Sequence, residues 1–196
     1  MLKRLADSQL LVDIGCFIGH DLRHLVNHGA PSDNIYGVDM VNFWDLGSEV
    51  FRDSEHFHAH FIETDLLAPN RCLRDLNGRC DIICISQALH QWDKEGQLQA
   101  AKELCKLSKP GSMVVGNQIG NLNAGELNLA SLPRPVWRHN KLSFSQLWEQ
   151  VGLATGTRWE CSAWMKTFGE IGWSEEDAKW MEEGARIIEF VVYRLA

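Results

Sequence analysis

The sequence predicts a doubly wound α/β domain. The stretch Leu10–Asn27, LLVDIGCFIGHDLRHLVN, has the pattern of a buried strand, a glycine turn and the first turns of a helix. Further along the chain, short apolar runs alternate with amphipathic segments, as expected when helices cover both faces of a parallel sheet. At 196 residues and 45% hydrophobic composition, the chain is long enough to bury a substantial core. We therefore expect residues 1–196 to form a single domain.

Composition narrows the class of partner. The formal net charge is -7, and neither a basic run nor a Lys/Arg stripe occurs, so we expect no nucleic acid or membrane surface as partner. No apolar run approaches the roughly 20 residues that a membrane span needs. The six cysteines are irregularly spaced, which indicates reduced thiols and no metal site. We expect a cytoplasmic protein that binds a small molecule.

The glycine turn predicts an anion site. Gly15 and Gly19 can adopt positive φ, and a helix that opens near Gly19 presents unpaired N–H groups at its positive end. Asp13, at the end of the strand, would repel a phosphate. It would suit a ligand that carries a positive charge beside its own carboxylate, as an amino acid headgroup does.

The next elements follow from periodicity and stop signals. The first helix ends at Gly29, with Pro31 after it, and Asn34–Met40 forms the second strand. The amphipathic helix Phe43–Arg52 comes next, and the third strand lies around His60–Thr64. The residues of this helix expected to face the sheet are Phe43, Leu46, Val50 and Phe51.

The second half of the chain repeats the alternation. The expected elements are a short helix Arg71–Leu76, a strand Cys80–Ser86, a helix Asp93–Leu107, a strand Ser112–Asn117, a helix capped by Ser143 that runs to Val151, and β-rich runs Thr157–Trp164 and Arg186–Leu195. Between the fifth strand and the last helix we expect a loop, Ile119–Leu142. A loop of this length in a compact domain is usually functional.

Acidic residues end the second and third strands. A carboxylate such as Asp39 offers two oxygens at the spacing of a vicinal diol, so it suits the ribose hydroxyls of a nucleoside. Asp65 ends the third strand. A solvated strand-end aspartate is the alternative interpretation of Asp39.

The spacing Asp13-x-Gly15-x-x-x-Gly19 resembles the first motif of class I S-adenosylmethionine-dependent methyltransferases, with Phe17 in the place of the usual middle glycine. The turn and strand SKPGSMVVG also match that family. The resemblance implies S-adenosylmethionine as cofactor and a seven-stranded, mostly parallel sheet with an antiparallel last strand. It implies that Asp65 binds the adenine amino group. The expected cofactor-binding residues are Asp13, Gly15, Cys16, Phe17, Gly19, Asp39, Met40, Asp65, Leu66, Ser86 and Gln87.

Within class I, the stretches IGCFIGHDLRHLVNHGAPSDNIYGVDM, LGSEVFRD and VGNQIGNLNAGE resemble a group of fungal methyltransferases of meroterpenoid and related secondary-metabolite pathways. Members of that group methylate a carboxylate on their substrate. Asn117 departs from the pattern, because an arginine is expected there. Only nine residues precede the first strand, so we expect the N-terminal segment that covers the cofactor in this family to be short or missing.

Candidate acceptor-side residues lie in the second half. His90 follows the fourth strand and titrates near neutrality, so it is the candidate catalytic residue, although it could be a loop histidine without a chemical role. The expected substrate-binding residues are Gln118, Asn121, Asn123, Trp137, Trp164 and Trp173. The three amides could instead stabilise their own loop, and core packing could explain the tryptophans.

Three functional hypotheses follow. The first is an S-adenosylmethionine-dependent O-methyltransferase acting on a carboxylate or hydroxyl of a secondary-metabolite intermediate. The second is a cofactor-binding protein without methyl transfer, either an isomerase or cyclase or a partner subunit. An NAD-type oxidoreductase is disfavoured, because Phe17 crowds a pyrophosphate site and Asp13 would face it. A homodimer could supply the missing cover from a neighbouring chain.

Overall fold

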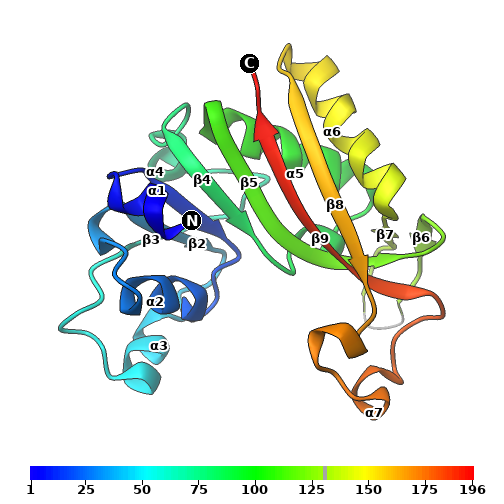
Figure 1. The fold of residues 1–196 in the computed structure, drawn as a ribbon, viewed down its shortest axis with the longest axis horizontal. Helices are drawn as coiled ribbons and strands as arrows, with labels where there is room; N and C mark the ends of the chain where they lie inside the picture. The colour runs from blue at the N-terminus through cyan, green and yellow to red at the C-terminus, as the bar shows by residue number, and fades with distance from the viewer. Residues whose placement is uncertain (130–131) are drawn as a thin grey trace.

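The computed structural model describes residues 1–129 and 132–196. Within these residues, a seven-stranded sheet has the order β3-β2-β1-β4-β5-β9-β8 (Figure 1). Its strands are β1 (Leu11–Ile14), β2 (Ile35–Asp39), β3 (His60–Glu63), β4 (Cys80–Ile85), β5 (Ser108–Asn121), β8 (Trp159–Lys166) and β9 (Ala185–Arg194). Strands β1 to β5 pair in parallel, and β9 runs antiparallel between β5 and β8. The predicted doubly wound sheet with an antiparallel last strand is confirmed.

Helices cover both faces of this sheet. Helices α1 (Leu2–Ala6), α2 (His20–Asn27) and α3 (Trp44–Phe51) contribute to one hydrophobic cluster, and α4 (Arg71–Arg74), α5 (Lys94–Leu107) and α6 (Lys141–Thr155) to another. The short α7 (Glu175–Ala178) lies in the excursion between β8 and β9, away from the sheet (Figure 1). The molecule is therefore a three-layer α/β/α structure. β1 lies between β2 and β4, and the chain adds strands outward from β1 in both directions.

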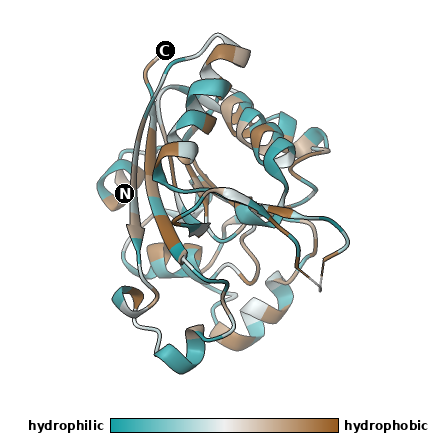
Figure 2. Ribbon diagram, turned by 90° about the vertical axis from the view of Figure 1, so that its right-hand side faces the viewer, coloured by the Kyte–Doolittle hydropathy of each residue, from teal (hydrophilic) through white to brown (hydrophobic). Residues whose placement is uncertain are grey.

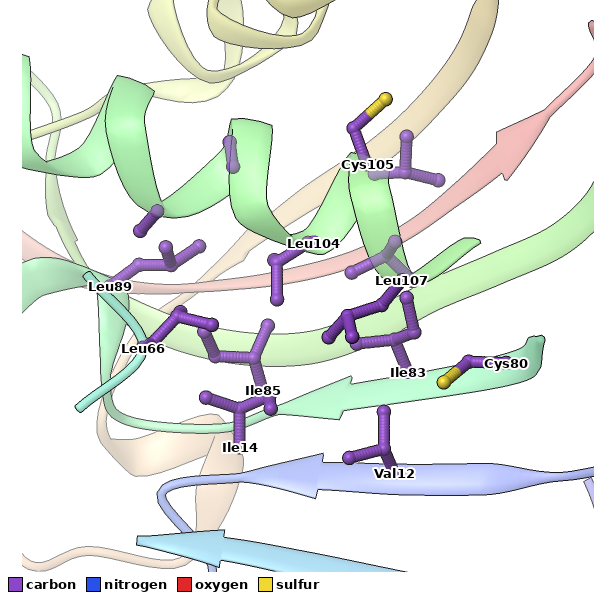
Figure 3. Close-up of a cluster of buried hydrophobic side chains, with 14 of the residues drawn as sticks. Val12, Ile14, Leu66, Cys80, Ile83, Ile85, Leu89, Leu104, Cys105 and Leu107 are labelled. Carbon is purple, nitrogen blue, oxygen red and sulfur yellow. The ribbon is translucent and has the colours of Figure 1, made fainter. Parts of the chain in front are cut away.

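The larger core lies between the central strands and α5. Val12 of β1 and Ile83 and Ile85 of β4 point toward Leu104 and Leu107 on α5 (Figure 3). Hydrophobic residues run along the strands, and the surrounding helices carry hydrophilic residues as well (Figure 2). Burial on both faces explains why these strands are continuous apolar runs.

The predicted face of α3 is wrong. Leu46, Val50 and Phe51 are exposed, and the helix instead buries Trp44 and Gly47. The indole of Trp44 occupies the space above Gly37 on β2, where a Cβ would lie 2.4 Å from the ring. A glycine on the strand thus selects which side of the helix packs, and a helix-period count cannot show that choice.

The predicted loop Ile119–Leu142 is also wrong over half of its described length. β5 continues to Asn121 because β9 pairs with it throughout, from Met113↔Tyr193 to Asn121↔Ala185. β6 (Gly125–Leu127) and β7 (Val136–Arg138) then form an antiparallel hairpin. Residues 130 and 131 of the predicted loop lie outside the described residues. Pairing with a strand 64 or more positions away extends β5 here, so local turn composition is misleading.

The cap of α6 is shifted from the predicted position. The N-cap is Asn140, whose side chain accepts a hydrogen bond from the Ser143 backbone N–H at 2.9 Å. In return, the hydroxyl of Ser143, at the third helical position, accepts a hydrogen bond from the Asn140 backbone N–H at 3.0 Å. The two residues form a capping box, so the helix begins at Lys141.

Two kinds of feature are absent from the described part of the chain. None of its helices is both long and apolar enough to cross a membrane. No group of three or more His, Cys, Asp or Glu side chains there is arranged to hold a metal ion.

Gly116 gives a test of the packing between β4 and β5. A Cβ there would lie 1.9 Å from the Ile85 carbonyl oxygen, a backbone atom that cannot move aside. We expect Gly116→Ala to reduce the free energy of unfolding by about 3 kcal/mol in urea titration. Gly125→Ala is the control, because nothing lies within 4 Å of its added Cβ. Equal stability of the two variants would contradict the packing described here.

Candidate active site

A cavity of about 680 Å³ opens at the carboxyl ends of β1, β2, β3 and β4. Strand order reverses at β1, since β2 lies on one side of it and β4 on the other, and ligands of open α/β sheets bind at such a point. The lining residues are Asp13, Ile14, Gly15, Cys16, Phe17, His20, Asp21, Val38, Asp39, Met40, Thr64, Asp65, Leu66, Ser86, Gln87, Ala88, Gln91, Trp92 and Asn117.

The turn after β1 has three residues in the left-handed region. Gly15, Phe17 and Gly19 have φ values of 78°, 49° and 70°. Phe17 thus takes the conformation that a glycine adopts at no steric cost, and its ring, half exposed, packs on Phe43 with 5.1 Å between centroids. Gly19 is the N-cap of α2 and offers no side-chain cap, which leaves N–H groups of the first helical turn available to a ligand.

Asp39 ties this turn to the end of β2. Its Oδ2 accepts a hydrogen bond from the Phe17 N–H at 2.8 Å, and its Oδ1 accepts from the Met40 N–H at 2.7 Å. Each carboxylate oxygen keeps a second lone pair. Asp39 is therefore held in one orientation and can still accept hydrogen bonds from a ligand in the cavity that it lines.

Asp65 has a similar local arrangement at the end of β3. Its Oδ1 accepts from the Leu67 N–H at 2.8 Å, and the preceding Thr64 N–H donates to the Asp39 carbonyl at 2.8 Å. Leu66, which lies between Asp65 and Leu67 in the chain, is buried and also lines the cavity. The ends of β2 and β3 are thus joined, and both present a carboxylate to the same space.

Asp13 is the buried acid of the site. Its side chain is almost inaccessible to solvent, and burial, with the carboxylates of Asp21 and Asp39 nearby, raises its pKa to about 7. Among the described residues that line the cavity, four are aspartates and none is lysine or arginine. The cavity consequently favours a ligand with a positive charge.

The opposite wall is built from the segment that follows β4 and from Asn117 within β5. Gln87 has a left-handed φ of 55°, and its backbone N–H donates to the Asn117 carbonyl at 2.8 Å. The Gln87 side-chain amide also donates to the side-chain oxygen of Asn117. The Asn117 amide nitrogen keeps its donors, so this wall offers uncharged hydrogen-bonding groups.

The structure brings together most of the predicted cofactor-binding residues. Asp13, Gly15, Cys16, Phe17, Asp39, Met40, Asp65, Leu66, Ser86 and Gln87 all line the cavity. Gly19 does not line it. The absence of a side chain at Gly19 leaves room for Arg23, because a Cβ there would lie 2.8 Å from the guanidinium.

His90 lies behind the cavity wall and is not among its lining residues. The side chain is buried in the short helix Leu89–Gln91, and its Nδ1 accepts from the Ile119 N–H at 3.3 Å. Burial and the nearby Arg138 guanidinium lower the pKa of His90 to about 4. The imidazole is therefore neutral at physiological pH, with one ring nitrogen already occupied.

The predicted substrate-binding residues are dispersed and lie outside the lining. Gln118 is fully buried in β5, and Asn121 supports the chain at Glu183, whose carbonyl accepts its amide at 2.8 Å. Asn123 is exposed and donates its backbone N–H to the Asn121 side chain.

The three predicted tryptophans have different surroundings. The backbone N–H of Trp137 donates to the carbonyl of Trp92 at 3.0 Å, so Trp137 is hydrogen-bonded to a cavity residue. Trp164 is half exposed on β8. Trp173 packs on Phe168, with 5.4 Å between ring centroids.

Sequence reasoning did not assign several lining residues to the site: Ile14, His20, Asp21, Val38, Thr64, Ala88, Gln91, Trp92 and Asn117. Most of them are immediate chain neighbours of assigned residues, which is a signal that could have found them. Asn117 had a different signal, as a polar residue near the carboxyl end of the fifth strand. It was noted only as a departure from the expected arginine.

The fold is that of S-adenosylmethionine-dependent methyltransferases. The crystal structure of Burkholderia thailandensis 1,6-didemethyltoxoflavin-N1-methyltransferase aligns with 100% of this chain and 76% of that one, with a TM-score of 0.68. That protein was crystallised with S-adenosylhomocysteine and its substrate. Because the two sequences are only 10% identical, the likeness defines the fold and no more.

Sequence comparison then defines the family. No protein-family model matches the chain. It is 39% identical over 205 residues to the O-methyltransferase atr3 of Stereocaulon alpinum, covering 100% of this chain and 57% of that protein. It is 37% identical over 201 residues to the O-methyltransferase phiE of a fungal species, covering 95% of this chain and 67% of that protein. The chain belongs to this family of fungal O-methyltransferases, and it spans little more than half to two thirds of these relatives' lengths.

Asp13 makes stability depend on pH. Its pKa is about 7 in the folded protein and near 3.8 when unfolded, so between these values the folded state binds more protons. Without ligand, the protein should lose stability as pH rises from about 4 to 7, and level off above. Asp13→Asn should remove this loss and be more stable than wild type at pH 8. Urea unfolding of both proteins at pH 5 and pH 8 measures these stabilities. An equal loss of stability between the two pH values in Asp13→Asn would contradict the role of Asp13.

Proposed function

We propose that this protein is an S-adenosylmethionine-dependent O-methyltransferase that acts on a carboxylate or hydroxyl of a secondary-metabolite intermediate. The observation that carries the proposal is the convergence of Asp13, Asp39 and Asp65, from the ends of three neighbouring strands, on one cavity. The names of the relatives support the O-methyl transfer.

The chemistry of the lining fits an adenosyl amino acid. Asp13 would pair with the ammonium group, and the N–H groups of the first turn of α2 would hold the carboxylate. The free lone pairs of Asp39 suit the ribose hydroxyls, and Asp65 with Leu66 suits the adenine ring and its amino group. An NAD-type ligand fits less well, because its pyrophosphate would meet Asp13, Asp21 and Asp39 with no lysine or arginine in the described lining.

The bound cofactor supplies a methyl group activated by its positive sulfur. The contribution of the chain is orientation, since methyl transfer needs the nucleophile about 3 Å from the methyl carbon and in line with it. We assign Asn117, Gln91 and Trp92 to the acceptor side, because they line the wall opposite β2 and β3. A carboxylate acceptor is already ionised at neutral pH and requires no base.

For the remaining candidates the geometry favours supporting roles. His90 would hold the wall through its bond to the Ile119 N–H, and its Nδ1 is not free to take a proton. Trp137 would back Trp92. The half-exposed Trp164 and Trp173 are proposed contacts for a large ring-containing acceptor.

The first test is ligand binding. Calorimetry with S-adenosylhomocysteine should give saturable heat with wild type, and Asp39→Ala should weaken binding by about tenfold or more, as expected for lost hydrogen bonds to a charged group. Asp75→Ala is the control, because Asp75 is an exposed aspartate at the end of α4 that does not line the cavity. No heat with wild type would remove the proposal.

Product mass separates methyl transfer from the alternatives. Incubation with S-adenosylmethionine and aromatic or terpenoid acids should yield a product heavier by one methyl group. A rearranged product of unchanged mass would instead establish a cofactor-binding isomerase or cyclase.

We also propose a cytoplasmic homodimer. Phe17 and Met40 of the cavity lining and Leu46 and Val50 on α3 are exposed apolar residues, and a surface rich in such residues is typical of an interface. Gel filtration at low and high protein concentration should show a dimer that Leu46→Glu dissociates, and a monomer throughout would exclude it.

A further inference from the structure

Arg23 is a buried cation outside the cavity. It lies on α2, and its side chain is 2% exposed. A buried charge is costly unless it is paired and hydrogen-bonded. Arg23 meets both conditions: its Nε donates to Asp53 Oδ2 at 2.8 Å, its Nη2 donates to Ser48 Oγ at 3.3 Å, and its Nη1 donates to the Ile18 carbonyl.

Aromatic rings complete the surroundings of the guanidinium. Its central carbon lies 4.3 Å from the ring centroid of Phe57, 5.3 Å from that of Phe51 and 5.8 Å from that of Trp44. Cation–π attraction therefore adds to the ion pair. The side chain joins α2, α3 and the segment that follows α3.

Two glycines make room for this arrangement. A Cβ on Gly47 would lie 2.5 Å from the Ile18 carbonyl oxygen and 3.0 Å from Arg23 Nη1. A Cβ on Gly19 would lie 2.8 Å from the same nitrogen. The close approach of α3 to the turn after β1 thus depends on the absence of side chains at both positions.

The contact with Ile18 connects Arg23 to the candidate active site. Ile18 follows Phe17, whose left-handed backbone is unfavourable for a residue with a Cβ and must be held by its surroundings. Asp39 Oδ2 accepts a hydrogen bond from the Phe17 N–H, and Arg23 donates one to the carbonyl of the following residue, Ile18. Arg23 itself does not line the cavity.

We infer that Arg23, clamped by Asp53, is a positioning residue that holds the turn Cys16–Gly19 in its left-handed form and so sets the orientation of Asp39 for the ligand. The inference rests on the proposed adenosyl ligand. It assigns to Arg23 an effect on ligand affinity that exceeds what its contribution to stability would explain.

Matched arginine variants test this. Arg194 is a partly buried arginine on β9, where its Nη1 donates to the carbonyls of Cys105 and Ser108 at 3.0 and 2.8 Å. Arg23→Met and Arg194→Met should both lower stability in urea titration. Only Arg23→Met should weaken S-adenosylhomocysteine binding, by about tenfold in calorimetry. Arg23→Lys, which keeps the charge but loses the planar fork, should fall between Arg23→Met and wild type.

A double-mutant cycle distinguishes positioning from general loosening. If Arg23 acts through Asp39, Arg23→Met should weaken binding much less in an Asp39→Ala background than in wild type. Amide hydrogen exchange of the Phe17 N–H should also accelerate in Arg23→Met and not in Arg194→Met. Asp53→Asn is the milder variant if Arg23→Met does not fold, and we expect several-fold weaker binding from it.

Failure of this inference differs from failure of the proposed function. Wild type that binds no S-adenosylhomocysteine overturns the proposed ligand. Wild type that binds, with folded Arg23→Met or Asp53→Asn binding equally well, overturns only the positioning role. Equal loss of affinity in Arg194→Met would overturn it too, because affinity would then simply follow stability.

Discussion

The site depends on one constraint, which is that a carboxylate is buried at the end of β1 beside a turn with three left-handed residues. Asp13 is shielded from water by the same packing that puts the turn next to β2, and other carboxylates face it across the cavity. This arrangement is unfavourable without a ligand, since like charges are brought together in a poorly hydrated space. A bound cation relieves it, so the energetic cost in the empty protein becomes selectivity for a positively charged ligand.

Hydrogen bonds to β2 and to Arg23 of α2 hold the turn after β1. Gly15 and Cys16 donate their N–H groups to the Val38 carbonyl at 2.8 and 3.2 Å, which fixes the start of the turn to β2. Asp39 then accepts a hydrogen bond from the Phe17 N–H, and Arg23 donates one to the Ile18 carbonyl. Phe17 can occupy a position that suits glycine because these contacts over-determine its backbone. A protein of the same family with glycine there would need fewer of them.

The two walls of the cavity differ in chemistry. The side formed by the ends of β1, β2 and β3 carries aspartates. The other side carries the amides of Gln87, which follows β4, and of Asn117 within β5. In the proposed function, this division separates a charged cofactor side from a neutral acceptor side. An amide at position 117 can hydrogen-bond an acceptor oxygen without adding a charge that would pair with the aspartates opposite.

By itself the sequence determined the main alternation of strands and helices, the doubly wound sheet, and the aspartates at or near the ends of β1, β2 and β3, since these follow from hydrophobic period, stop signals and a short motif. The tertiary structure decided what depends on distant pairing. Antiparallel β9 extended β5 through Asn121 and made Gln118 a buried strand residue, and Gly37 chose Trp44 as the packing face of α3. It also placed His90 behind the wall and Asn117 in it. The proposed cofactor side could be predicted because each of its acids lies at or near the end of a strand that the hydrophobic pattern marks. The proposed acceptor side depends on how far β5 extends and how the segment after β4 packs, and only the tertiary structure shows that.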